Sequence, residues 1–172
     1  GRVTLGVTGE HNVYNSLAAL AAVLELGVNL DAAIAGLKVF GGTDRRFEKK
    51  GVIGGVTIID DYAHHPQEIH ATLEAARHYP HRKLWCVFQP HTYTRTKAFM
   101  DQFAQEMARA DEVIVADIYA ARETDNLGIS SANLVEKIRA MGTKAHYIPS
   151  FAEIETFILQ NCMQGDVLIT MG

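Results

Sequence analysis

The chain has 172 residues, of which 48% are hydrophobic and 21% charged, and this composition is that of a globular protein with one good-sized domain or one domain plus part of another. The formal net charge is −4 and no run of Lys or Arg occurs, which argues against nucleic acid or a membrane surface as the main partner. The longest apolar runs, such as residues 17–24, are far too short for a membrane span.

The first 40 residues are expected to be mainly helical. Residues 3–7 are predicted to form a strand, and residues 12–26 a helix that ends near Gly27. Apolar residues recur all round this helix, so we expect it to be largely buried. A second, short helix is predicted over residues 30–37, where an early Asp favours the helix dipole.

A polar stretch with two glycines, residues 40–46, predicts a domain boundary. We therefore expect one unit over residues 1–40 and a second over residues 41–172. At the start of the second unit, residues 47–50 and 56–60 flank several glycines, which predicts a β-hairpin.

Strands and helices then alternate along the chain. One helix is predicted to begin at Pro66, with Ile69, Leu73 and Ala76 on its apolar face. The other predicted helices are residues 97–109, 130–141 and 151–163. The further predicted strands are residues 83–89, 112–117, 144–148 and 166–170. Most of these strands are nearly continuous apolar runs, which is typical of parallel strands buried on both faces. The predicted fold class is α/β: a Rossmann-like open, mostly parallel sheet with helices on both faces, preceded by a helical segment.

Dense polar sequences follow three of the predicted strands. They are residues 60–66, 89–95 and 117–123; each contains Tyr with His or Arg, and the first and the third also contain acidic residues. In open α/β sheets, ligands bind outside the carboxyl ends of the strands. Three such segments at one edge of the sheet favour a binding site over ordinary surface loops.

Structural alternatives exist for several of these residues. The acidic pair Asp60–Asp61 has the alternative of ending a strand and capping the helix at Pro66. Tyr62 has the alternative of simple packing, and Arg95 that of pairing with an acid such as Asp101. A metal site at His64–His65 is disfavoured, because adjacent histidines do not easily point to one ion and no ligand spacing completes the set.

Asn12 and Asn15 are three residues apart near the start of the first predicted helix, on one face of it. Helix capping is the structural alternative for Asn12. It does not explain Asn15, whose amide has both a donor and an acceptor and suits the edge of a nucleobase.

The two cysteines, Cys86 and Cys162, form no Cys-x-x-Cys pattern and are expected to be free buried thiols. Together with the lack of a signal peptide, they fit a cytoplasmic protein. The chain begins at Gly1 without Met, so we expect a piece of a longer protein.

At these motifs the chain resembles the Mur ligase family. Gly9-x-His11-Asn12-x-x-Asn15, followed by an Ala-rich helix, resembles the end of the family's central ATPase domain. Residues 45–48 resemble the segment that crosses into the C-terminal domain. Residues 60–66 and 88–96 are similar to the signatures of the members that add L-alanine.

The resemblance implies an ATP-dependent ligase that adds L-alanine to UDP-N-acetylmuramate in peptidoglycan synthesis, through an acyl phosphate. The implied ligands are ATP with Mg²⁺, L-alanine and UDP-N-acetylmuramate, with the Mg²⁺ ligands outside this chain. It implies that Asn12, Asn15, Arg46 and Asp61 bind the nucleotide.

The resemblance also implies that Tyr62, His64, His91 and Arg95 surround the alanine, and that His64, His91 and Arg95 take part in catalysis. Arg95 has a planar fork suited to a carboxylate. We expect it near a helix N-terminus, where free N–H groups favour an anion.

Three departures from the family pattern stand out. Thr92 occupies a position where many relatives have a second Arg, no Gly-x-x-x-x-Gly-Lys-Ser/Thr loop occurs, and the chain ends at Gly172 where relatives continue. The fragment alone is therefore expected to be inactive.

Two alternatives remain: the sister ligase that recycles a murein tripeptide, and a non-catalytic nucleotide- or amino-acid-binding module. The sequence predicts no oligomeric state.

Overall fold

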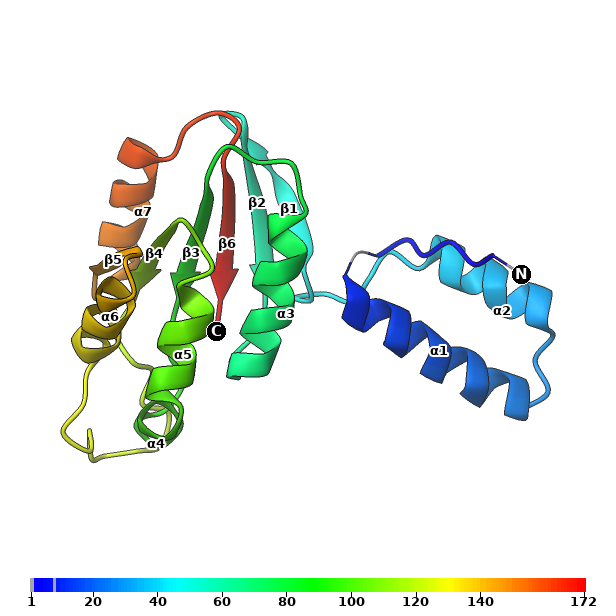
Figure 1. The fold of residues 1–172 in the computed structure, drawn as a ribbon, viewed down its shortest axis with the longest axis horizontal. Helices are drawn as coiled ribbons and strands as arrows, with labels where there is room; N and C mark the ends of the chain where they lie inside the picture. Colours follow the sequence, from blue (N-terminus) through cyan, green and yellow to red (C-terminus); the bar gives the residue numbers. More distant parts are fainter. Residues whose placement is uncertain (1, 8) are drawn as a thin grey trace. The chain divides into compact units, whose positions relative to one another are not determined.

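A computed structural model describes residues 2–7 and 9–172 of the chain (Figure 1). The chain divides into two units, Gly1–Asp44 and Arg45–Gly172.

The first unit is a pair of helices, α1 (Glu10–Glu25) and α2 (Leu30–Val39). Gly27 ends α1 with φ 82°, a conformation that a residue without Cβ adopts at little cost. The N–H groups of Gly27 and Val28 donate to the carbonyls of Leu24 and Val23, both at 2.9 Å, which is the Schellman arrangement. The predicted end of this helix is confirmed.

Two expectations for this unit are wrong. Residues 3–7 form no strand, because a strand needs a partner and the described part of this unit contains only helices. The helix α1 is not largely buried: Tyr14 is 64% exposed and Leu17 57%, and Ser16 is its only buried residue. Among the described residues of the unit, α1 packs against α2, and one neighbouring helix covers one side of an apolar helix.

The second unit is built on a six-stranded sheet. Its strands are β1 (Glu48–Ile53), β2 (Val56–Asp61), β3 (Leu84–Phe88), β4 (Glu112–Val115), β5 (Lys144–Tyr147) and β6 (Val167–Met171), in the order β1-β2-β6-β3-β4-β5. Only the pairing of β1 with β2 is antiparallel. The last strand, β6, returns to lie between β2 and β3 (Figure 1). The predicted open, mostly parallel sheet is confirmed.

The predicted hairpin is formed by β1 and β2. Ile53 pairs with Val56, so the turn consists of Gly54 and Gly55 alone. Both have positive φ, 57° and 80°, as a two-residue hairpin turn with the matching twist requires.

Three helices, α3 (Pro66–Arg77), α5 (Met100–Met107) and α6 (Ser131–Ala140), cover one face of the sheet (Figure 1). The predicted apolar face of α3 is confirmed, since Ile69, Leu73 and Ala76 are all 0% exposed. Phe103 of α5 and Leu134 of α6 belong to the same core.

The opposite face carries α7 (Phe151–Asn161). Its Ile154 packs in one cluster with Trp85 of β3, and the Phe157 ring lies 6.4 Å from the Trp85 ring. Helices therefore lie on both faces of the sheet, as predicted.

The single helix predicted over residues 97–109 is instead two, α4 (Tyr93–Ala98) and α5. The break is at Phe99, whose φ of −113° and ψ of 16° lie outside the helical range. This backbone lets the Phe99 ring pack edge-on against His65, at 4.8 Å, and near Phe103. Tertiary packing of one aromatic ring thus overrides helix continuity.

Both cysteines are free, Cys86 fully buried and Cys162 partly exposed. Burial raises the pKa of the Cys86 thiol to about 12, so this thiol stays protonated at neutral pH. In the described part of the chain, no helix has the length and apolar character needed to cross a membrane.

Candidate functional site

The three predicted polar segments meet at one edge of the sheet, because β2, β3 and β4 run parallel. Backbone hydrogen bonds join the loops at this edge. The Gln89 N–H donates to the Met171 carbonyl at 3.0 Å, and the Tyr119 N–H donates to the Pro90 carbonyl at 2.9 Å. The expectation of a shared polar edge is confirmed.

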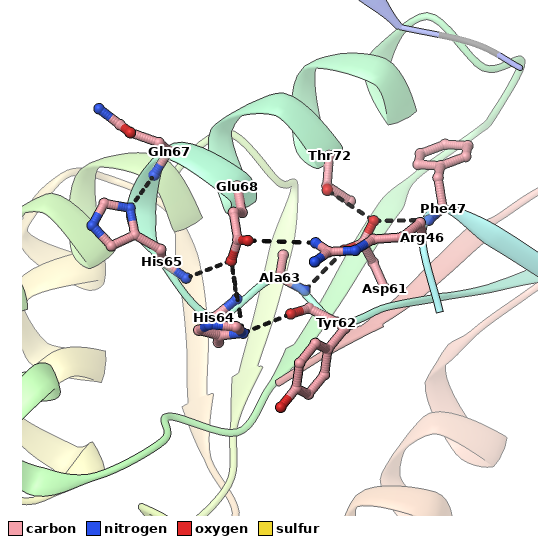
Figure 2. Close-up of polar contacts among 10 residues, drawn as sticks. All are labelled: Arg46, Phe47, Asp61, Tyr62, Ala63, His64, His65, Gln67, Glu68 and Thr72. Carbon is pink, nitrogen blue, oxygen red and sulfur yellow. Dashed lines mark hydrogen bonds and ion pairs between the residues drawn. The ribbon is translucent and has the colours of Figure 1, made fainter. Parts of the chain in front are cut away.

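Asp61 lies at the end of β2 and is only 5% exposed. One carboxylate oxygen accepts from the Phe47 N–H at 2.8 Å and from the Thr72 hydroxyl at 3.0 Å, and the other from the Ala63 N–H at 2.8 Å (Figure 2). Burial raises the pKa of the Asp61 carboxyl, and these three hydrogen bonds oppose that rise. Asp61 therefore ties the segment that enters β1 to the end of β2 and to α3.

The capping alternative for the acidic pair does not hold. The N-cap of α3 is His65, whose ring Nδ1 accepts from the Gln67 N–H, and Glu68 completes the capping box. Asp60 is bonded elsewhere: it accepts from the Thr170 hydroxyl at 2.8 Å. Neither acid therefore caps the helix.

Glu68 is a site residue that the sequence analysis missed. Its Oε2 accepts from the N–H groups of His64 and His65, and its Oε1 lies 3.4 Å from the guanidinium of Arg46 (Figure 2). Burial alone would raise the pKa of Glu68, but the hydrogen bond from His64 and the charges of His64 and Arg46 bring it below its ordinary value. The signal was present, because an acid three residues after a helix cap is typical of a capping box.

Arg46 is thereby held at the same edge as Asp61. Its side chain is half exposed, and its Nη1 donates to the Glu68 carboxylate at 3.4 Å, which leaves other N–H groups of the guanidinium open to solvent. A guanidinium of this kind retains donors for an anion.

Tyr62 and His64 form a pair of aromatic rings next to these residues in the chain. The Arg45 guanidinium lies 4.4 Å from the centre of the Tyr62 ring, and the ring itself is 4.9 Å from that of His64. Tyr62 is 41% exposed, so packing does not account for all of its surface. His64 Nδ1 lies 2.9 Å from the Tyr62 carbonyl, which only accepts. In the neutral ring Nδ1 therefore has the proton, and Nε2 is left as an acceptor.

His91 presents a buried polar atom that has no partner. Its Nδ1 makes no hydrogen bond within the described chain, and its ring lies 5.4 Å from that of Tyr119. Buried polar atoms of this kind are normally bonded, so an orphaned one indicates a ligand or an ordered water.

Arg95 is on the same loop-and-helix segment, and its guanidinium makes no hydrogen bond or ion pair with the residues that the structure describes. The structural alternative for Arg95 was pairing with an acid such as Asp101. That carboxylate instead lies 2.7 Å from Lys137 of α6. Arg95 is thus available to an anion.

One expectation about Arg95 needs correction. The N–H groups at the start of α4 are not free, because those of Tyr93 and Thr94 donate to the Glu123 carboxylate. Hydrogen bonds from the side chain and backbone of Thr94 and from the Tyr93 backbone lower the pKa of Glu123. Any anion bound by Arg95 must therefore be held by side chains and not by this helix terminus. No local pattern predicts this contact, because it joins residues 30 apart in the chain.

Thr92 caps α4 in a backbone conformation that is unusual for a β-branched residue. Its φ is 66° and its ψ 143°, and its hydroxyl accepts from the Arg95 N–H at 3.4 Å. Its N–H donates to the Tyr119 carbonyl at 2.8 Å, which fixes the strained backbone. Such strain is common at binding sites.

We predict opposite effects for two substitutions at Thr92. Thr92→Gly should keep or raise the melting temperature, because relief of about 1–3 kcal/mol of strain outweighs a cap loss of a few tenths. Thr92→Ala should lower the stability by about 1 kcal/mol, because the strain stays and the cap is lost. Thermal unfolding of both variants beside wild type is the measurement. A glycine variant less stable than the alanine variant would contradict this account.

Asn12 and Asn15 belong to the first unit. The N-cap of α1 is Gly9, so capping does not explain Asn12. The Asn15 amide donates to the Asn12 side-chain oxygen at 3.4 Å, which places both amides on one face of the first turns. In the described residues, no group of three or more His, Cys, Asp or Glu side chains is arranged to hold a metal ion.

The fold and this polar edge define a class of protein. Residues 45–172 match the family model of the Mur ligase, glutamate ligase domain, and the chain belongs to this family.

Its relatives specify the class further. The chain is 61% identical over 170 residues to the UDP-N-acetylmuramate–L-alanine ligase of Lachnospira eligens, a match that covers 99% of this chain and 37% of that protein. It is 55% identical to the enzyme of the same name from Lachnoclostridium phytofermentans, with 99% and 36% covered. The chain thus spans little more than a third of the length of these relatives.

Solved structures agree. The UDP-N-acetylmuramate-alanine ligase MurC of Thermotoga maritima superimposes with a TM-score of 0.82 at 29% identity, covering 99% of this chain and 36% of that one. A murein peptide ligase of Psychrobacter arcticus gives a TM-score of 0.70 at 28% identity, covering 99% and 35%.

Proposed function

We propose that the full-length protein to which this chain belongs is a cytoplasmic, ATP-dependent ligase that adds L-alanine to UDP-N-acetylmuramate in peptidoglycan synthesis. The observation that carries the proposal is the orphaned Nδ1 of His91 together with the guanidinium of Arg95, unpaired among the described residues, on one segment at the carboxyl edge of a Mur ligase domain. An unpaired cation and an unsatisfied imidazole suit a small carboxylate. The identity of 48–61% to relatives named as alanine ligases favours alanine as that carboxylate.

We assign four residues to the nucleotide: Asn12, Asn15, Arg46 and Asp61. Residues 1–40 would be the end of the ATPase domain, with Asn12 and Asn15 reading the adenine edge through their paired amides. Arg46 would approach the phosphates with the donors that Glu68 leaves open. Asp61 would serve the nucleotide mainly by fixing the backbone next to Arg46. ATP would be used with Mg²⁺, whose ligands we expect outside this chain.

The alanine would lie between Arg95, His91 and the pair formed by Tyr62 and His64. Arg95 would hold its carboxylate, which leaves the amine free. The acceptor Nε2 of His64 would take a proton from the alanine ammonium group. The amine would then attack the muramoyl acyl phosphate, forming the amide bond and releasing phosphate.

The full-length protein, supplied with ATP and Mg²⁺, tests the proposal. We expect UDP-N-acetylmuramoyl-alanine to form from L-alanine, with ADP and phosphate released in equal amounts. Efficient use of a murein tripeptide in place of alanine would favour the sister recycling ligase. ATP or alanine binding without turnover of either amine would favour a non-catalytic module.

The isolated chain of 172 residues is predicted to turn over no ATP above a buffer control. The chain contains no Gly-x-x-x-x-Gly-Lys-Ser/Thr loop, and such a loop with its metal supplies most of the charge stabilisation in phosphoryl transfer. Phosphate release from the purified chain is the measurement, and the full-length protein is the positive control. Sustained release by the chain alone would contradict the prediction.

A further inference from the structure

The segment from Tyr119 to Glu123 is fastened to the start of α4 at both of its ends. At the first end the Tyr119 N–H donates to the Pro90 carbonyl, and its carbonyl accepts from the Thr92 N–H. At the second end the Glu123 carboxylate accepts from the N–H groups that begin α4. Residues between these two points are held close to the candidate alanine site.

Arg122 lies between the two attachment points. The Glu123 N–H donates to the Ala120 carbonyl at 2.9 Å, so residues 120–123 form a tight turn, and Ala121 has φ 54°. The Arg122 side chain is exposed, and it makes no hydrogen bond or ion pair with the described residues. Its backbone is therefore fixed while its guanidinium is free.

The acids next to Arg122 are already in use. Glu123 binds the start of α4, Asp117 accepts from the Tyr147 hydroxyl, and Asp125 accepts from the Leu127 N–H at 2.9 Å. A single exposed Arg without a partner is ordinary. Here a second one, Arg95, lies on the segment to which the Arg122 turn is bonded, and the orphaned imidazole of His91 lies on that same segment, four residues before Arg95.

The neighbouring residue Thr92 supplies no charge. Its backbone contacts the Arg122 segment directly through the 2.8 Å hydrogen bond to Tyr119. The segment that contains Arg122 is therefore bonded to the residue that directly follows His91 and lies three residues before Arg95.

We propose that Arg122 is the second guanidinium of the alanine-carboxylate clamp, acting together with Arg95. This inference rests on the proposed function. A carboxylate has two oxygens and about four lone-pair directions, so it can accept from two guanidinium groups at once. Lysine at this position would offer a point charge without the planar fork.

Steady-state kinetics of the full-length protein test the inference. Arg122→Ala should raise the KM for L-alanine by roughly ten-fold, the lower end for a charge-assisted hydrogen bond because the side chain is exposed. The KM values for ATP and UDP-N-acetylmuramate should stay within about two-fold of wild type. The Ki of L-alaninamide, which lacks the carboxylate charge, should also be unchanged. Arg122→Lys should restore only part of the alanine affinity.

A matched control is available in Arg77, an exposed arginine in the last turn of α3, at the far end of that helix from the site. Arg77→Ala removes the same charge and should leave all three KM values unchanged. Melting temperatures of both variants should stay close to wild type.

The possible outcomes distinguish failure of the Arg122 assignment from failure of the proposed function. If wild type forms no alanine adduct, the proposed function fails. If wild type is active and Arg122→Ala leaves the KM for alanine unchanged, the function stands and the inference is overturned. A rise in the KM for ATP instead, or an equal loss of affinity for alanine and alaninamide, would also overturn it, since neither depends on the alanine carboxylate.

Discussion

Arg95→Ala in the full-length protein is expected to raise the KM for L-alanine by roughly ten- to a hundred-fold, the effect of losing a charge-assisted hydrogen bond of about 1.5–3 kcal/mol. Arg95 has no protein partner among the described residues, so its loss breaks no internal bond. The melting temperature should therefore stay close to that of wild type. The KM for ATP should change little, because Arg95 follows β3, whereas Arg46 precedes β1 and Asp61 ends β2.

Two further variants sharpen this result. Arg95→Lys keeps the charge and loses the planar fork, so it should also be impaired. Lys97→Ala is a matched control, because this neighbouring cation is exposed and donates to the Leu127 carbonyl. A large fall in melting temperature for Arg95→Ala, with alanine affinity intact, would leave Arg95 as a structural residue and remove it from the site.

Asp61→Ala is expected to lower the free energy of unfolding by about 2–4 kcal/mol. The substitution leaves the N–H groups of Phe47 and Ala63 without their acceptor in a place that is 5% exposed, and each unsatisfied buried donor costs about 1–3 kcal/mol. The Thr72 hydroxyl can rotate toward another acceptor, so it adds less. Chemical denaturation of the 172-residue chain is the measurement.

The same variant should weaken ATP binding more than alanine binding in the full-length protein. Releasing the Phe47 N–H frees the backbone next to Arg46, which we assign to the phosphates. Asp60→Ala is the matched control: it removes an adjacent carboxylate that is less buried and accepts from Thr170. Its cost should be about 1 kcal/mol. If Asp61→Ala left the KM for ATP unchanged and raised that for alanine, the assignment of Asp61 would be wrong.

Acidic and basic side chains at this edge of the sheet differ in their partners. The acidic side chains accept hydrogen bonds from the chain itself: Asp61 from three donors, Glu68 from two backbone N–H groups, and Glu123 from the N–H groups that begin α4. The guanidinium groups of Arg95 and Arg122 make no hydrogen bond or ion pair with the described residues. The edge therefore offers unpaired positive charge to an anionic substrate, while its negative charge stabilises the loops.

Much of this arrangement was predictable from the sequence because it depends on short-range patterns. The hairpin follows from Gly54–Gly55, the start of α3 from Pro66, and the parallel sheet from continuous apolar strands. Parallel strands bring their carboxyl ends to one edge, so the meeting of the three polar segments was predictable as well. Local backbone preference and side-chain period specify each of these features independently of distant residues.

Other features were decided by tertiary contacts between residues distant in sequence. The bond from Phe47 to Asp61 made that acid structural, and the bond from Tyr93 to Glu123 occupied a helix start that we expected to be free. The Phe99 ring ended α4 early by packing against His65. The sequence alone therefore determined most of the elements and the edge where the site lies. Only the folded structure determined which polar groups at that edge remain unpaired, because each carboxylate binds the donors that the fold brings nearest to it.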